Sequence, residues 1–302
     1  MAEMKIIKRI NNRDYKINYT PVPAHKLPEK IRESEKEKLQ SINSSKINLK
    51  DVTFMIPLRI ESEDRKRCLT IVIDYLIKHF DTKILVLEEG AGSLFPSIKK
   101  IEWEPYVKYI YRNTDQALFY KTLDLNIMSR HATTPIICAL DSDCIFYPRQ
   151  YVQAANKIRL KTLDFCYPFN QPNFNIRKEH ISDLERTLDP ASVHSRITPP
   201  TALVPPGGCF FMNKEKFIEG GMENQNMISY GPEDTERRDR MTILGYNVGS
   251  IDGPLFHIDH SRTTNSNDHN PLFIKNTEEY RKVKMMSRNQ LRNYVSTWEW
   301  TV

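Results

Sequence analysis

The sequence lacks long apolar runs, regularly spaced cysteines and internal repeats. No stretch of its 302 residues approaches the roughly 20 apolar residues that a membrane-spanning helix needs. The N-terminus is charged and has none of the apolar block typical of a secretory signal. The five cysteines show no CxxC spacing, which favours buried thiols over disulfides or a metal site. Together these absences predict a protein of the reducing cytoplasm.

The sequence also lacks a large excess of either charge. It has 44 Lys and Arg residues and 38 Asp and Glu residues, which gives a net charge of +6. Basic and acidic residues alternate in runs such as IRESEKEKLQ, which is typical of solvated helix faces. A mildly basic surface fits either an anionic membrane or an anionic nucleotide substrate. The aromatic residues lie mostly in apolar strands rather than in basic clusters, so we expect no nucleic-acid partner.

Short apolar segments alternate with amphipathic ones from residue 52 onwards. The segments VTFMIPL, KILVLEEG, VKYIYR and TPIICALDSD are predicted to be strands, because each is short and apolar. Between the first two, apolar residues recur at helical spacing, and DQALFYKTLDLNIMSR is predicted to form another helix. Strands that alternate with helices predict an α/β fold with a mainly parallel central sheet.

Three parts are predicted along the chain: a polar, partly helical extension at 1–50 with a charged helix near Ile31–Ile42, a main domain at 51–262, and a helical extension at 263–302. The last part should contain one charged amphipathic helix from Asn276 to Thr297. Residues 165–206 are rich in Pro and Asn and show little periodicity apart from a helix near His180–Leu188. This stretch is predicted to be a functional loop that closes over a bound ligand.

Later segments supply the remaining elements. GGCFFMNKEKFIEGG predicts a strand and a short helix, GPEDTERRDRMTILGYN predicts a helix, and NVGSIDGPLFHIDHSR predicts a last strand that ends in histidines. Ligands of parallel sheets bind beyond the carboxyl ends of the strands, where Arg59, Glu88, Asp141 and Asp143 are expected. We therefore expect the functional site at this edge of the sheet.

The Asp141-Ser142-Asp143 motif follows a buried strand, where a pair of carboxylates is costly unless another group compensates it. Mg²⁺ or Mn²⁺ bridging a diphosphate would compensate it, because hard cations prefer carboxylate and phosphate oxygens. The alternative is a loop cap or turn without a ligand. His257 and His260 are further metal-ligand candidates, but residues three apart on a strand face opposite sides. We therefore expect only one of them, preferably His260, to join Asp143.

Glu233 and Asp234 stand where a helix is predicted to begin. Carboxylates in a first helical turn stabilise the helix by roughly 0.3–1 kcal/mol. A placed carboxylate can also act as a general base that takes a proton from a sugar hydroxyl, which accelerates a reaction by about 10²–10⁴-fold. The two roles are compatible.

Six motifs occur in a fixed order between Val52 and Arg262: Ile-Pro-Leu-Arg, FYKTLDLN, LDSD, PPGGCFFMNKEKF, YGPED and HIDHSR. In this order they resemble the β-1,4-galactosyltransferase branch of the GT-A glycosyltransferases and the related bacterial capsule and chondroitin-type transferases. The resemblance implies a GT-A fold and an inverting transfer of a hexose or N-acetylhexosamine from a UDP-sugar. It also implies Mn²⁺ or Mg²⁺ as cofactor, and a glycan or lipid-linked glycan as acceptor. The implied setting is bacterial surface polysaccharide synthesis. Whether the cytoplasmic protein also associates peripherally with the inner face of the membrane stays open at this point.

The resemblance also implies roles on the donor side. Pro57 and Arg59 match the turn that holds the uridine and diphosphate, and Phe119 and Lys121 match the Phe-x-Arg of the donor-binding helix. Lysine keeps the charge of that arginine but loses its fork geometry. The remaining donor-side residues are Gly207 and Gly208, which match paired glycines that let the backbone approach the sugar, and the strand-end residues Glu88 and Asp141.

For the metal, the resemblance implies Asp143 and His260 as ligands. His257 falls where a methionine completes the site in the animal enzymes, which leaves the choice between Mn²⁺ and Mg²⁺ open. Pro205 falls where those enzymes carry a tyrosine. A smaller residue leaves room for an N-acetyl group, so a GalNAc or GlcNAc donor is a further hypothesis.

On the acceptor side, the resemblance implies Tyr230 as a flat face for a sugar, Glu233 as an acceptor contact and Asp234 as the catalytic base. Pro232 replaces a glycine of the matching motif, which puts the mobility of the preceding loop in doubt. Other classes stay open at this point. A retaining transferase or a sugar nucleotidyltransferase would share the sheet and the acidic metal site, although residues 56–64 contain no glycine for a phosphate loop. A non-catalytic glycan- or nucleic-acid-binding protein is the other alternative.

Overall fold

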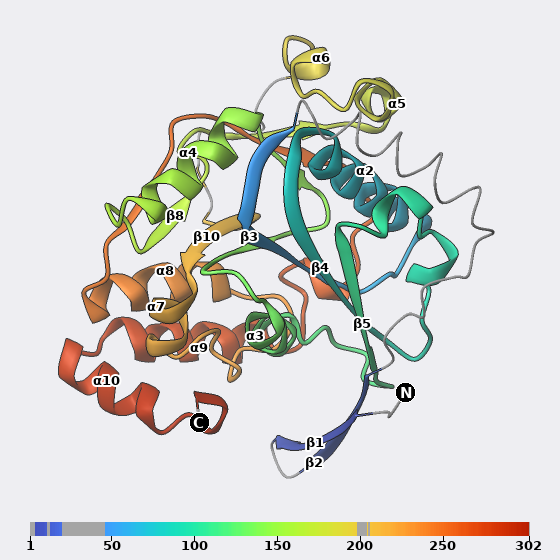
Figure 1. Cartoon of the computed structure of the whole chain (residues 1–302). Helices are drawn as coiled ribbons and strands as arrows, with labels where there is room; N and C mark the ends of the chain where they lie inside the picture. Colours follow the sequence, from blue (N-terminus) through green and yellow to red (C-terminus); the bar gives the residue numbers. More distant parts are fainter. Residues whose placement is uncertain (1–3, 11–12, 20–45, 198–203, 205, 302) are drawn as a thin grey trace.

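A seven-stranded sheet with the order β11-β8-β10-β6-β3-β4-β5 forms the centre of the protein (Figure 1). The computed structural model describes residues 4–10, 13–19, 46–197, 204 and 206–301. The strands of this sheet are β3 (Ile47–Leu58), β4 (Phe80–Gly90), β5 (Val107–Asn113), β6 (Ile136–Leu140), β8 (Phe165–Tyr167), β10 (Cys209–Asn213) and β11 (Val248–Ser250).

One strand of the sheet runs against the others. β3 pairs in parallel with β4 and β6, β4 pairs in parallel with β5, and β8 pairs in parallel with β11. β10 is antiparallel to both β6 and β8, with Cys209 opposite Leu140. The prediction of an α/β fold with a mainly parallel sheet is confirmed. The reversal of β10 places its first residues at the edge where β3 and β6 end.

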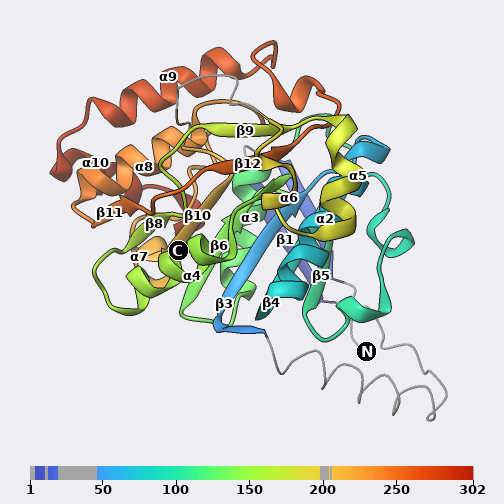
Figure 2. The same ribbon diagram turned by 90° about the horizontal axis from the view of Figure 1, so that it is seen from above.

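Helices cover both faces of the sheet, as the two views show (Figures 1 and 2). On one face, Tyr151 of α4 (Pro148–Arg159) packs edge-on against Phe54 and lies near Tyr75 of α2 (Glu63–His79). On the other face, Arg237 of α8 (Glu233–Leu244) lies over the ring of Phe210. The core is thus buried from both sides, as expected for a largely parallel sheet.

The other elements surround this core. A second sheet has the order β7-β12-β9, and an antiparallel pair joins β1 to β2. The bounds of these strands and of the remaining helices are as follows: β1 Met4–Ile10, β2 Arg13–Tyr19, β7 Cys144–Ile145, β9 Asn173–Ile176, β12 Leu255–Ile258, α3 Lys121–His131, α5 Lys178–Thr187, α6 Ala191–His194, α7 Lys214–Glu219, α9 Phe273–Lys284 and α10 Arg288–Ser296. Short 3-10 turns cover Phe95–Ser97, Ile101–Trp103, Thr264–Ser266 and Glu299–Thr301.

The predicted C-terminal helix over Asn276–Thr297 is two helices, α9 and α10. Ser287 begins α10, because its side chain accepts a hydrogen bond from the Gln290 backbone N–H in a capping box. The predicted last strand is likewise two strands, β11 and β12, in different sheets. Gly253, at a φ of 146°, and Pro254 interrupt it, since neither residue favours continuation of a strand.

Two long segments also differ from expectation. Residues 165–206 contain β8, β9, α5 and α6, and β8 belongs to the central sheet. The start of this segment is therefore part of the scaffold rather than of a closing loop. In the predicted N-terminal extension, the described residues form β1 and β2, and the helix predicted near Ile31–Ile42 lies outside the described residues. Within the part of the chain that the structure describes, no helix combines the length and apolar character needed to cross a membrane.

Candidate active site

A polar cavity of about 510 Å³ opens at the carboxyl edge of the central sheet. It is lined by the ends of β3 and β6, the segment before β10, the first residues of α3 and α8, and residues that follow β12. Nearly all of the residues predicted from the sequence meet here: Pro57, Arg59, Phe119, Lys121, Asp141, Asp143, Gly207, Gly208, Tyr230, Glu233, Asp234, His257 and His260. The common edge of the strands explains why segments far apart in the sequence converge.

Glu88, predicted as a donor-binding residue, does not reach the cavity. Its buried carboxylate accepts hydrogen bonds from the backbone N–H groups of Leu94 (2.9 Å) and Phe95 (3.1 Å) and from the Tyr109 hydroxyl. The neighbouring Glu89 faces the other side of the strand and pairs with Arg59 at 2.9 Å. Because successive side chains of a strand alternate between its faces, the two carboxylates point to opposite sides of the sheet, and neither lines the cavity.

Asp143, His257 and His260 form a group that could hold a metal ion, since their ligand atoms lie within 4.8 Å of one another. His260 Nε2 lies 2.9 Å from Asp143 Oδ2, and His257 Nε2 lies 3.9 Å from Asp143 Oδ1. The expectation that only one histidine would approach Asp143 is wrong. β12 ends at Ile258, so His260 lies beyond the strand and the two-residue alternation no longer applies to it.

The surroundings of this group fit a cation. His260 Nδ1 lies 2.8 Å from the Ser261 carbonyl oxygen, and an N–H donated there leaves Nε2, which faces Asp143, as the ligand nitrogen. Burial opposes ionisation of Asp143, but His257, His260 and Arg65 outweigh it and hold the pKa of this carboxyl well below its usual range. The donor set of one carboxylate and two imidazoles therefore offers a charged oxygen and two nitrogens.

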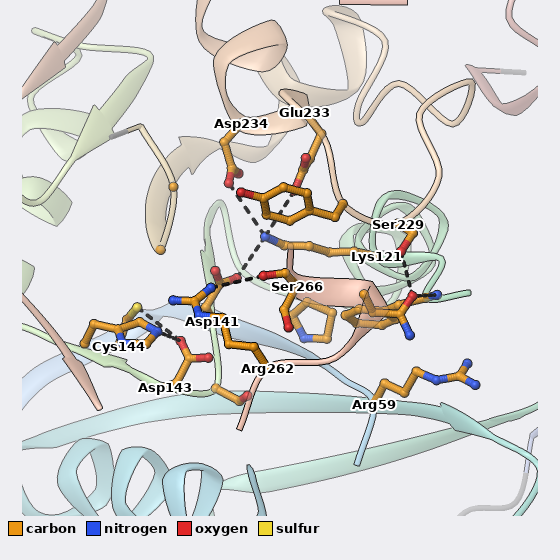
Figure 3. A pocket seen from close by; sticks show the side chains of 18 of the residues that line it. Arg59, Lys121, Asp141, Asp143, Cys144, Ser229, Glu233, Asp234, Arg262 and Ser266 are labelled. Carbon is orange, nitrogen blue, oxygen red and sulfur yellow. Dashed lines mark hydrogen bonds and ion pairs between the residues drawn. The ribbon is translucent and has the colours of Figure 1, made fainter. Parts of the chain in front are cut away.

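Lys121 lies between the acidic groups of the cavity (Figure 3). As the first residue of α3, it places Nζ 3.0 Å from Asp141 Oδ1 and 3.8 Å from carboxylate oxygens of both Glu233 and Asp234. Burial disfavours its charge, but the three carboxylates outweigh burial and raise the pKa of Lys121 well above its ordinary value. A permanent cation thus links the end of β6 to the start of α8.

Glu233 and Asp234 are adjacent carboxyl groups with opposite pKa shifts. Burial and the neighbouring charge of Asp234 raise the pKa of Glu233 to about 8. Burial acts on Asp234 as well, but Lys121 and Arg237 outweigh it and hold its pKa below the ordinary value. Arg237 forms an ion pair with Asp234 one helical turn away. At neutral pH, one carboxyl group is therefore largely protonated and the other is ionised, which is the division that acid–base chemistry uses.

The two glycines before β10 are required by close packing. A Cβ atom on Gly207 would lie 2.6 Å from Asp234 Oδ2, so the backbone of Gly207 lies directly against this carboxylate. Gly208 has a φ of 99°, and a Cβ atom there would lie 2.7 Å from Leu255 Cδ1. Pro205, on which the N-acetyl hypothesis depended, lies outside the described residues.

Some residues of the cavity were not predicted from the sequence. Arg65 approaches Asp143 at 3.9 Å from the first turn of α2, and Glu61, Ser229 and Asn265 also line the cavity. Arg59 was predicted to hold the donor, but its guanidinium already donates to Glu89 and to the carbonyl oxygens of residues 116 and 118. The only sequence signal for Asn265 is the polar run TTNSNDHN after the last histidine motif, a composition typical of turns.

Comparison with known proteins shows the class of fold. No family profile and no curated protein matches the sequence. Among solved structures, the mannosyltransferase PcManGT from Pyrobaculum calidifontis, in complex with GDP-Man and Mn²⁺, is similar at a TM-score of 0.51 and 14% identity, over 82% of this chain and 68% of that one. S. aureus TarS has a TM-score of 0.48 and 10% identity, over 69% of this chain and 36% of that one. The similarity to PcManGT shows that the chain has a glycosyltransferase fold, and its polar cavity lies at the carboxyl edge of the sheet.

Proposed function

We propose that this chain is a metal-dependent, inverting glycosyltransferase that moves a sugar from a nucleoside diphosphate to a hydroxyl of a glycan acceptor. The observation that carries this proposal is the meeting of two kinds of groups in one cavity. The Asp143–His257–His260 group could hold a cation, and the ionised Asp234 could take a proton. A glycosyltransferase fold supports the same conclusion.

Asp143, His257 and His260 would hold the divalent cation, Mn²⁺ or Mg²⁺. The bound cation would neutralise negative charge on the departing nucleoside diphosphate. Two imidazole nitrogens beside one carboxylate favour a transition metal such as Mn²⁺ over Mg²⁺, which prefers oxygen ligands and retains its waters. Sequence resemblance favours UDP as the nucleotide.

Two cationic side chains, Lys121 and Arg59, shape the donor half of the cavity in different ways. Lys121 is charged and lies within reach of three carboxylates, so it can also contact an anionic diphosphate that enters between them. Arg59 orients the segment before α3 by donating to the carbonyl oxygens of residues 116 and 118. The absence of side chains at Gly207 and Gly208 leaves room for the sugar to approach the backbone.

The proposed reaction is a single displacement. The acceptor oxygen forms a bond to the anomeric carbon while the bond between that carbon and the diphosphate oxygen breaks. The electron pair of the broken bond leaves with the nucleoside diphosphate. Asp234 takes the acceptor's proton, and the configuration at the anomeric carbon inverts. Protonated Glu233 can donate a hydrogen bond to an acceptor oxygen, and Tyr230 offers a flat face to the acceptor sugar. Lys121 and Arg237 keep Asp234 ionised at neutral pH.

A panel of UDP-sugars and GDP-mannose, each with Mn²⁺ or Mg²⁺, tests the function by release of the nucleoside diphosphate with and without glycan acceptors, lipid-linked ones included. Assignment of the product's anomeric configuration by NMR separates inversion from retention. If no nucleotide-sugar of the panel is bound or turned over with either metal, the proposed function is wrong. A product that retains the donor's configuration would remove the displacement mechanism.

Asp234→Asn tests the base directly. It keeps the shape of the side chain, so we expect nucleotide and metal binding to persist while transfer slows by at least ~100-fold. Asp239→Asn is a matched control on the same helix, because Asp239 contacts Arg238 and Tyr280 and lies outside the cavity. Near-normal turnover by Asp234→Asn would contradict the role of this carboxylate.

A further inference from the structure

A short segment beyond the last strand crosses the rim of the cavity. It contains the 3-10 turn Thr264–Ser266, which a capping box at Thr263 begins. Asn265 and Ser266 of this segment line the cavity together with residues of the donor and acceptor sides. Asn265 is only half-buried.

The Asn265 amide uses every hydrogen-bonding position it has. Its Nδ2 donates to Glu61 Oε1 at 2.7 Å and to the Ala117 carbonyl at 3.2 Å. Its Oδ1 accepts from the Phe119 backbone N–H at 2.8 Å and from the Ser229 hydroxyl at 2.6 Å. An amide offers two N–H groups and two acceptor positions, and here all four are paired. Neither an aspartate nor an apolar side chain can satisfy this set.

The partners of this amide belong to different halves of the site. Ala117 and Phe119 lie in the segment that leads into α3 and Lys121, which is the donor half. Ser229 immediately precedes Tyr230 in the acceptor half and has a φ of 61°, a left-handed conformation that is uncommon for serine. Its hydroxyl donates to Asn265 and accepts from Asn270 Nδ2 at 2.8 Å. Contacts from the 263–270 segment thus hold this conformation in place.

We infer that Asn265 is a positioning residue that couples the donor half of the cavity to its acceptor half. The inference rests on the proposed function. When a bound nucleotide restricts the motion of residues 117–119, the hydrogen bonds of the amide also restrict the motion of Ser229 and of the loop that carries Tyr230. Asn276 of α9 holds the far side of this loop through Ile228 and the Tyr230 carbonyl, so the loop can respond as a unit. A coupling of this kind between two sites is typically 5–150-fold in affinity.

Hydrogen exchange with UDP plus Mn²⁺, and separately with GDP plus Mn²⁺, tests the coupling without any acceptor. In the wild-type protein, nucleotide binding should slow amide exchange both at residues 117–121 and at residues 228–231. In Asn265→Ala, slowing at 117–121 should persist, while slowing at 228–231 falls from about 5–150-fold to near unity. Asn265→Asp keeps an oxygen for Phe119 and Ser229 but cannot donate to Ala117 or Glu61, so its slowing at 228–231 should lie between those of wild type and Asn265→Ala.

Asn267→Ala is the matched control. Asn267 lies in the same segment, but it donates to the Thr263 carbonyl and accepts from the His269 N–H within that segment alone. It should retain slowing in both regions. Equal slowing of amide exchange at 228–231 in Asn265→Ala and wild type would overturn the inference. So would the absence of slowing at 228–231 in the wild type, or a loss of nucleotide binding in Asn265→Ala. Failure of the wild type to bind either nucleotide would instead overturn the proposed function, and the inference with it.

Discussion

Gly207→Ala changes a single methyl group beside the proposed base. The new Cβ atom would lie 2.6 Å from Asp234 Oδ2, whereas ordinary contacts begin near 3.4 Å, so the carboxylate must move by about 0.8 Å. A displacement of about 1 Å in a catalytic group can slow a reaction by about 10²-fold, which is about 2.7 kcal/mol of activation free energy. We therefore expect kcat to fall about 10–100-fold with little change in nucleotide affinity. Steady-state release of the nucleoside diphosphate and calorimetric titration with nucleotide measure the two quantities.

A double-mutant cycle shows whether the methyl group acts through Asp234. If it does, Gly207→Ala should add little to the defect of Asp234→Asn, because the displaced group is already inactive. If the methyl group instead blocks the sugar, the two defects should multiply. An unchanged kcat in Gly207→Ala, or full multiplication in the double variant, would refute the reasoning. The fold should survive, since the strained glycine of the pair is Gly208, at a φ of 99°.

Two further predictions concern the metal group and pH. His257→Ala should weaken Mn²⁺ binding at least ~10-fold in calorimetric titration. His269→Ala changes an exposed histidine outside the cavity and should leave Mn²⁺ binding unchanged. Equal Mn²⁺ affinities of His257→Ala and wild type would exclude His257 as a ligand. The pKa of Glu233 is raised from 4.5 to about 8, so the folded protein retains a proton that the unfolded chain releases, and the free energy of unfolding falls as pH rises through this range. Glu233→Gln removes this loss. In urea denaturation, the free energy of unfolding of Glu233→Gln minus that of wild type should increase between about pH 5 and about pH 8. A difference that stays constant over this range would contradict the raised pKa of Glu233.

The strand segments along the chain and the edge of the sheet that carries the cavity could be predicted because they depend on short-range patterns. Apolar runs such as IICAL identify buried strands, and a parallel arrangement brings their carboxyl ends to one edge. Asp141 and Asp143 follow one such run directly, so their approach to the cavity requires no knowledge of the rest of the fold. The same holds for Arg59 after β3.

What could not be predicted depends on orientation and on long-range contacts. Glu88 and Glu89 are adjacent and chemically alike, and the face to which each points is decided by the packing of β4. His260 joins His257 because β12 ends two residues before it, and helix and strand ends are the least certain features of a sequence. Asn265 is placed by contacts with residues 61, 117, 119 and 229, and no local pattern records them.

The reversal of β10 has a consequence for changing the donor sugar of the proposed reaction. For β3 and β6, the chain that follows the strand lines the cavity, whereas for β10 the chain that precedes it does so. The helix α7, which follows β10, begins at the opposite edge beside Pro135. Insertions or substitutions upstream of Cys209 would therefore reshape the sugar's surroundings directly. Changes of the same size after Asn213 would fall on the remote rim, where they would affect solubility or folding and leave selectivity intact.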